Sequence, residues 1–221
     1  MKWLNKMERK FGRFAIPNLM MIIIIGQGMV FLADMLNPAI GLNYLFSLSR
    51  SAILHGEIWR LFTFIFIPPT NNLLGLVFTL YLYYLIGNTL ENEWGDFKFN
   101  VYYLCGIFGA ILAAMVTGSG VNFYLNLSLF LAFAIMYPDH ELLLFFVIPV
   151  KMKYLAYMAG VYYILMVIVG SFAVKAAIVF SLANFLLFFG GDFMRYAKQE
   201  IKYYKTRKAW RDNNNNNNNR W

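Results

Sequence analysis

The chain has 221 residues, of which 60% are hydrophobic and 14% are charged, and its formal net charge at pH 7 is +8. This balance is too apolar for an ordinary soluble domain and predicts an integral membrane protein with one domain. The Lys and Arg residues gather at the two ends of the chain. Orientation of the chain in the membrane explains this positive charge, so nucleic-acid binding is excluded as its reason.

Basic segments flank the apolar region and predict that both ends of the chain are cytoplasmic. We expect a basic N-terminal segment at 1–14, a membrane domain at 15–195 and a basic tail at 196–221. The tail contains seven consecutive asparagines, Asn213 to Asn219, and this polar run predicts disorder. The sequence shows no organellar transit pattern and no ER-retrieval residues, which favours a bacterial plasma membrane.

Six apolar stretches follow one another in the membrane domain and predict six transmembrane helices, at about 16–36, 72–91, 99–116, 122–137, 154–170 and 172–189. Gly26 and Gly28 in the first stretch predict close helix packing. The fourth stretch is short, which predicts hydrophobic mismatch with the bilayer. The more polar stretch 37–69 is expected to be an amphipathic loop in the membrane interface, and 142–150, too short to cross, is expected along the cytoplasmic surface.

The loop before the second span contains the pair Trp59-Arg60. At a membrane interface an indole can lie among the lipid headgroups, while a guanidinium donates hydrogen bonds to loop carbonyls or lipid phosphates. Both uses of Arg60 remain open, and an interfacial loop can also carry Trp and Arg without such a role.

A second motif, Gly87, Glu91, Trp94 and Gly95, lies at the cytoplasmic end of the second span. The spacing i, i+4, i+7 and i+8 places these residues on one face of a continuing helix. We expect Glu91 to accept hydrogen bonds from the backbone amides of the following turn. This structural role would fix how the second and third spans connect.

Together these two motifs resemble those of the rhomboid and Derlin superfamily, which has a Trp-Arg pair in a large first loop and a Gly, Glu, Trp-Gly pattern after its second span. A weaker third element is Ser128 in the short fourth span, with Pro138 and the run 148–153 beyond it. The resemblance covers roughly residues 15–195. It implies an all-α membrane protein with a rhomboid-like six-helix bundle and a large interfacial loop between the first two helices.

The resemblance does not extend to catalysis. A rhomboid protease uses a Gly-x-Ser-Gly serine on its fourth span and a histidine on its sixth, because a serine hydroxyl needs a base within reach to become a nucleophile. Here Ser128 has no flanking glycines and the stretch 172–195 has no histidine. Ser128 is therefore a vestigial catalytic candidate, with His55 of the outer loop as a weak alternative base, while His140 is expected on the cytoplasmic side.

Several neutral polar residues are expected around an outward cavity: Asn71, Asn72, Asn126, Ser128 and Asn184. Asn71 and Asn72 also fit helix N-capping at the start of the second span, and this interpretation is the stronger one. We expect no cofactor and no metal site, because two distant histidines and no clustered carboxylates make no ligand set. The single cysteine, Cys105, excludes an intramolecular disulfide.

Three functions remain open. The leading hypothesis is a rhomboid-like pseudoprotease that binds or handles transmembrane segments of client membrane proteins, in quality control, trafficking or assembly. The alternative is a rhomboid-family intramembrane serine protease with an atypical active site. The third is a small-solute transporter or channel, which is disfavoured because the span cores contain only neutral polar residues. The expected partners are the lipid bilayer and client segments, and the sequence does not predict an oligomeric state.

Overall fold

A computed structural model describes residues 2–120, 122–144, 148–190, 203 and 206–207. The chain divides into two units, 1–185 and 186–221. The structural account below concerns the first unit and the helix Phe172–Gly190, which begins in it. The expected disorder of Asn213 to Asn219 lies outside the described residues.

Helices dominate the described residues. In chain order they are α1 (Lys2–Phe11), η1 (Gly12–Phe14), α2 (Leu19–Leu36), α3 (Leu42–Phe46), α4 (Arg50–Leu54), α5 (Arg60–Thr63), η2 (Phe64–Phe66), α6 (Leu73–Trp94), α7 (Asp96–Thr117), α8 (Phe123–Met136), α9 (Met152–Val169) and the helix Phe172–Gly190. The strands are β1 (Leu48–Ser49), β2 (Ser119–Gly120), β3 (Glu141–Leu144) and β4 (Ile148–Lys151). The predicted helical membrane class is thus confirmed, with two small strand pairs added to it.

Within the described part of the chain, five helices are long and apolar enough to cross a membrane: α2, α6, α7, α9 and the helix Phe172–Gly190. The fourth predicted span corresponds to α8, which has only 14 residues. At 1.5 Å per residue it is about 21 Å long, whereas the hydrocarbon core is about 30 Å thick. The structure therefore supports five spans by length, and the expected six are not confirmed.

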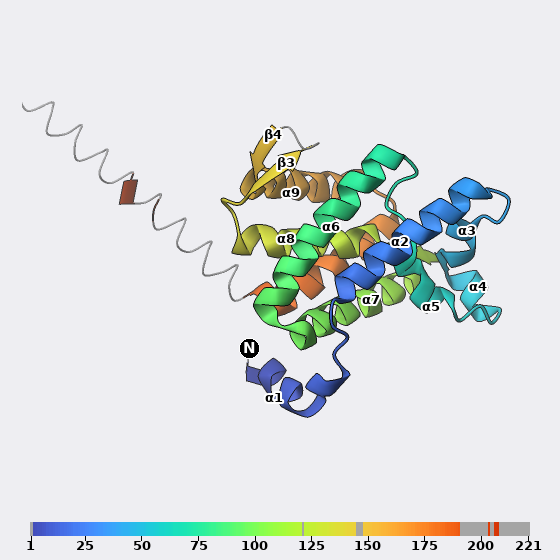
Figure 1. Ribbon diagram of the computed structural model, residues 1–221, viewed down its shortest axis with the longest axis horizontal. Helices are drawn as coiled ribbons and strands as arrows, with labels where there is room; N and C mark the ends of the chain where they lie inside the picture. Colours follow the sequence, from blue (N-terminus) through green and yellow to red (C-terminus); the bar gives the residue numbers. More distant parts are fainter. Residues whose placement is uncertain (1, 121, 145–147, 191–202, 204–205, 208–221) are drawn as a thin grey trace, which may run out of the picture. The chain divides into compact units, whose positions relative to one another are not determined.

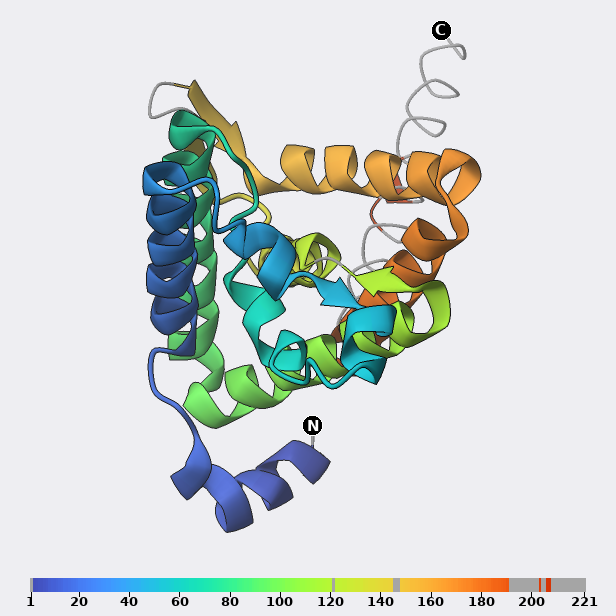
Figure 2. The same cartoon turned by 90° about the vertical axis from the view of Figure 1, so that its right-hand side faces the viewer.

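α2 and α6 lie side by side in Figures 1 and 2, and α7 and α9 run crosswise to this pair. Gly87 makes the close approach of α2 and α6 possible, because a Cβ there would lie 2.1 Å from the Met20 Cγ. Gly26 likewise admits the ring of Phe66, 2.2 Å from its ideal Cβ, whereas Gly28 faces open space. The prediction of close packing is therefore confirmed at Gly26, against the first loop, and wrong at Gly28.

The first loop is more ordered than the expected amphipathic loop, because short helices and β1 fold it into a compact cap. β1 pairs antiparallel with β2, which joins the loop to the turn between α7 and α8 (Leu48 opposite Gly120). Leu48, Phe64 and Ala114 form a buried cluster there. Asn122 adds a side-chain tie, since its Nδ2 donates to the carbonyl of Ile67 at 2.9 Å.

α8 is the central helix of the first unit. Figure 2 shows it end-on, in yellow-green, with α6, α7 and α9 around it. Eight of its 14 residues are buried. Because protein surrounds α8, its short length does not by itself impose the mismatch with lipid that the sequence predicted.

The apolar stretch 142–150 is a β-hairpin at its described ends. β3 and β4 pair antiparallel, with Glu141 opposite Lys151, and residues 145–147 lie outside the described part of the chain. Strand pairing satisfies the backbone of a segment too short to cross as a helix. At the base of the hairpin, Lys153 Nζ donates to Asp139 Oδ1 at 2.8 Å, and this contact lowers the pKa of Asp139.

Candidate functional site

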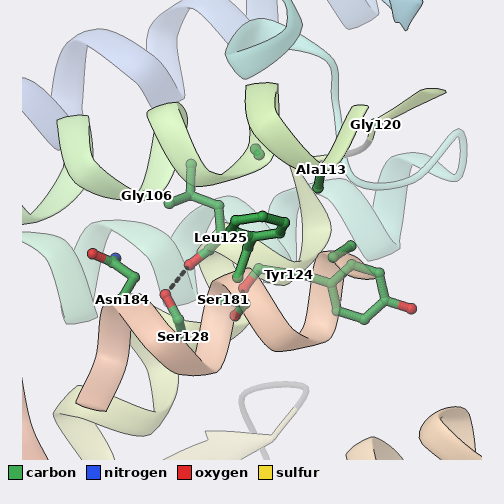
Figure 3. A pocket seen from close by; sticks show the side chains of 11 residues that line it. Gly106, Ala113, Gly120, Tyr124, Leu125, Ser128, Ser181 and Asn184 are labelled. Atoms are coloured by element: carbon green, nitrogen blue, oxygen red, sulfur yellow. Dashed lines mark hydrogen bonds between the residues drawn. The ribbon is translucent and has the colours of Figure 1, made fainter. Parts of the chain in front are cut away.

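Ser128 lies on α8 and is completely buried. Its Oγ donates to the backbone carbonyl of Leu125 at 2.7 Å (Figure 3). It also accepts a hydrogen bond from the Tyr102 hydroxyl at 3.0 Å. The serine proton is therefore held by a carbonyl of its own helix. A hydroxyl in this arrangement is a structural hydrogen-bonding group, since activation requires a base that takes the proton.

Ser128 borders a small cavity between α7, α8 and the helix Phe172–Gly190 (Figure 3). The volume is about 20 Å³. A water molecule needs roughly 10–15 Å³ of such volume, so the cavity has room for about one water and none for a peptide.

Opposite Ser128, the last helix contributes Ser181 and Asn184. Ser181 Oγ donates to the Tyr124 carbonyl at 2.6 Å and lies 3.1 Å from the Tyr163 hydroxyl. Asn184 Nδ2 donates to the Tyr102 carbonyl at 3.4 Å, while its Oδ1 is buried and has no hydrogen-bond partner among the described residues. No ionisable acid or basic side chain is among the described residues that line the cavity. Its polar groups can therefore hold a water but do not supply a general base.

The two histidines lie elsewhere. His55 caps α4, where its Nδ1 lies 2.7 Å from the Ser51 carbonyl oxygen. His140 packs edge-on against Phe133, with ring centroids 5.7 Å apart. The structure does not bring His55 to Ser128, so the weak alternative base has no contact with the serine.

Gly106 on α7 is a site residue that the sequence interpretation missed. A Cβ at this position would lie 2.1 Å from Cδ1 of Leu125 and 3.1 Å from Nδ2 of Asn184. α7 therefore supplies the glycine that lets α8 approach, a role that the sequence interpretation sought beside Ser128. The available signal was a glycine in the middle of a predicted span.

The other predicted polar residues are spread out. Asn126 is buried and accepts a hydrogen bond from the Tyr103 hydroxyl at 3.4 Å, but it does not line the cavity of Ser128. Asn72 caps α6, since its Oδ1 accepts from the amide of Leu74 at 2.9 Å, as the N-capping interpretation predicted. Asn71 lines a different cavity. Of the five expected cavity residues, the structure brings only Ser128 and Asn184 together.

The Trp59-Arg60 pair organises the first loop. Arg60 is 3% exposed, and its Nη1 donates to the carbonyls of Tyr44 at 2.6 Å and Ser47 at 2.9 Å. Glu57 neutralises the guanidinium, with Nε to Oε2 at 2.6 Å. Trp59 is half exposed, as an interfacial indole would be. Of the two partners that the sequence left open for Arg60, loop carbonyls and lipid phosphates, the structure shows the loop carbonyls.

The second motif connects different elements from those expected. Glu91 Oε1 accepts the amide of Leu19, in the first turn of α2, at 2.9 Å, instead of an amide of the following turn. α6 ends at Trp94, and Gly95 turns the chain there with φ of +83°. Trp94, also in α6, reaches a third element, since its Nε1 donates to Met136 Sδ at 3.2 Å. The motif therefore fixes the first span against the second and anchors α8.

The apolar helices and their buried polar ties define an integral membrane protein in contact with the lipid bilayer. The sequence profile of the family described as "Eukaryotic integral membrane protein (DUF1751)" matches residues 18–202, and the chain belongs to this family. A search of curated proteins found no match. The family is eukaryotic, so the expected bacterial plasma membrane is wrong. That expectation rested on the absence of short targeting signals, which says little about the membrane in which an integral protein resides.

Proposed function

We propose that this protein is a non-catalytic, rhomboid-like membrane protein that binds transmembrane segments of other membrane proteins. The observation that carries the non-catalytic part is the state of Ser128, whose hydroxyl donates to Leu125 and faces a cavity of about 20 Å³. A rhomboid-type attack would need that proton to pass to a base. Tyr102, Ser181 and Asn184 around it are neutral hydrogen-bonding groups.

Support for binding a membrane segment comes from α9. Only 11% of the apolar stretch of this helix is buried inside the protein, compared with 39% for α7. Among the described residues, no atom lies within 4 Å of the ideal Cβ of Gly160, and Val161 and Ile164 beside it are 57% and 63% exposed. Ala156 lies four residues earlier, which completes a small-xxx-small pattern. Such a pattern lets a second transmembrane helix approach closely, and in lipid this close packing drives association.

The resemblance to rhomboids and Derlins supports the same reading. The first loop has the Arg60 hydrogen bonds to loop carbonyls, and the second span has the Gly87 and Glu91 contacts to α2. Both devices stabilise a scaffold without taking part in chemistry. The proposal extends this scaffold to clients in quality control, trafficking or assembly.

Site-specific photo-crosslinking in native membranes tests client binding. A photoreactive residue at Val161 should capture membrane proteins, and Gly160→Leu in the same background should reduce the capture by blocking close approach. Phe108 on α7, 62% exposed, is the matched position on another lipid-facing helix. Equal capture from Val161 and Phe108, or capture unaffected by Gly160→Leu, would contradict the proposal.

A fluorophosphonate probe tests the non-catalytic part separately. The purified protein should remain unlabelled, as should Ser128→Ala. Labelling that disappears in Ser128→Ala would establish a serine hydrolase with an atypical active site and reject our reading of Ser128.

A further inference from the structure

A second cavity lies where the end of α2 meets the start of α3 and the start of α6. Its volume is about 390 Å³. Its polar lining consists of Asp34, Asn43 and Asn71, and its apolar walls include Phe31, Met35 and Leu73. It is therefore large enough for a ligand of several atoms with one polar end.

Asp34 is an acidic residue in α2, two residues before the end of this candidate membrane-spanning helix. Its Oδ1 accepts the amide of Leu42 at 2.7 Å and its Oδ2 accepts the amide of Asn43 at 3.1 Å. Each carboxylate oxygen retains a second acceptor site. The ion pairs in the described part of the chain do not include Asp34. An ionisable side chain in a membrane-spanning helix usually marks a functional site, and a cation is the natural partner of a carboxylate.

The two asparagines extend this acceptor character. Asn43 Oδ1 is enclosed and has no hydrogen-bond donor in the described structure. Asn71 is exposed, lies two residues before α6 and lines the cavity. Asp34 and Asn71 offer oxygen acceptors at the cavity, and Asn43 adds an enclosed oxygen that has no donor in the described structure. A primary ammonium group has three N–H donors and a positive charge, so it matches this set, whereas a quaternary ammonium has no N–H to donate.

We propose that this cavity binds the primary ammonium of a membrane lipid, the ethanolamine headgroup of a zwitterionic phospholipid. The rim favours a lipid over a free amine, because Met35 and Leu73 are 62% and 52% exposed and present apolar surface beside the acceptors. The acyl chains of a lipid bound at Asp34 would continue along this surface. The inference is independent of client binding at α9.

The test uses the full chain in nanodiscs that contain equal amounts of phosphatidylethanolamine and phosphatidylcholine, with the retained lipid measured by native mass spectrometry. The wild-type protein should retain phosphatidylethanolamine preferentially. Asp34→Asn, which keeps the shape and one acceptor oxygen, should reduce the preference about tenfold, as expected for loss of a charged hydrogen bond. Glu141→Gln is the control, because this exposed carboxylate lies on β3 and away from the cavity.

Asn71→Leu provides a second variant in case Asp34→Asn fails to fold, since Asn71 does not hold the α3 amides. It should reduce the preference about threefold, as expected for a neutral hydrogen bond. Added ethanolamine should leave the bound lipid in place, and its displacement would assign the cavity to a free amine and overturn the lipid source. Equal retention of both lipids by the wild type, a preference that survives both variants, or crosslinking of the cavity to lysines of a protein partner would each overturn the proposal.

Discussion

Glu91 in α6 accepts a hydrogen bond from the backbone amide of Leu19 in α2, 72 positions earlier in the chain, at 2.9 Å. The first amides of a helix have no partner within the helix and carry partial positive charge, so a carboxylate there both satisfies a donor and stabilises the helix dipole. Asn18, which precedes α2, has φ of 53° and offers no side-chain cap. A residue of the second span thus performs the capping that the first span lacks.

Replacing Glu91 should destabilise the contact between these two helices. We expect Glu91→Ala to lower the free energy of unfolding by about 1–2 kcal/mol, because it leaves the Leu19 amide unpaired in an apolar environment. Glu91→Gln keeps an acceptor oxygen and should lose less. Thermal unfolding in detergent, followed by tryptophan fluorescence, measures the difference, and equal Tm values for the two variants would show that the hydrogen bond does not matter.

The contact between Gly87 and Met20 gives a second prediction. Gly87→Ala places a methyl group 2.1 Å from the Met20 Cγ. Such overpacking typically costs about 1–3 kcal/mol. Met20→Ala in the same chain removes the obstacle. The double variant should therefore lose less free energy of unfolding than the sum of the losses of the two single variants. Gly28→Ala is the control, since its Cβ meets no atom within 4 Å and should leave Tm nearly unchanged. An additive double variant would show that the two side chains do not meet.

Arg60 should be irreplaceable even by lysine. The guanidinium serves Glu57 and the carbonyls of Tyr44 and Ser47 at once, and an ammonium cannot reproduce this planar set of donors. We expect Arg60→Lys to cost about 2–4 kcal/mol, because buried groups lose their partners, and to make the loop 37–69 susceptible to limited proteolysis.

The matched control for this loop is Arg50→Lys, because Arg50 is exposed and follows β1. Its cleavage pattern should equal that of the wild type. Resistance of Arg60→Lys to proteolysis would mean that the loop is held by its apolar cluster alone.

Ser128 and Tyr102 should behave as a structural pair. Ser128→Ala removes the acceptor of the Tyr102 hydroxyl and should cost about 1–2 kcal/mol. Tyr102→Phe removes the donor of this hydrogen bond, so Ser128→Ala should cost less in that background. The four Tm values of this double-mutant cycle check the coupling. If the costs of the two substitutions are fully additive, the 3.0 Å hydrogen bond between Tyr102 and Ser128 does not contribute to stability.

Much of the membrane architecture could be predicted because it depends on local properties of the chain. The length and apolarity of α2, α6, α7, α9 and the last helix are written in continuous stretches of sequence, since a helix in lipid satisfies its own backbone. The capping by Asn72 and the role of Arg60 were also predictable, because both act on carbonyls or amides of nearby residues. The membrane in which the protein resides could not be predicted, because no local sequence pattern indicates it.

The acidic residues show where local reasoning failed. The sequence interpretation found only neutral polar groups in the span cores, yet Asp34 and Glu91 both lie within membrane-spanning helices. Their positions near helix ends made them look like flanking residues. Only the fold shows that Glu91 caps another helix and that Asp34 lines a cavity.

The sequence by itself therefore determined that this is a membrane protein of apolar helices with a Trp-Arg loop, because hydrophobic length and interfacial residue types act through the solvent that each segment meets. Tertiary structure alone decided which helix each polar side chain serves, that α8 is enclosed by protein, and that Ser128 faces a cavity of about 20 Å³. Those outcomes depend on contacts between residues far apart in the chain, such as Gly106 with Leu125, and no periodicity or spacing along one segment records them.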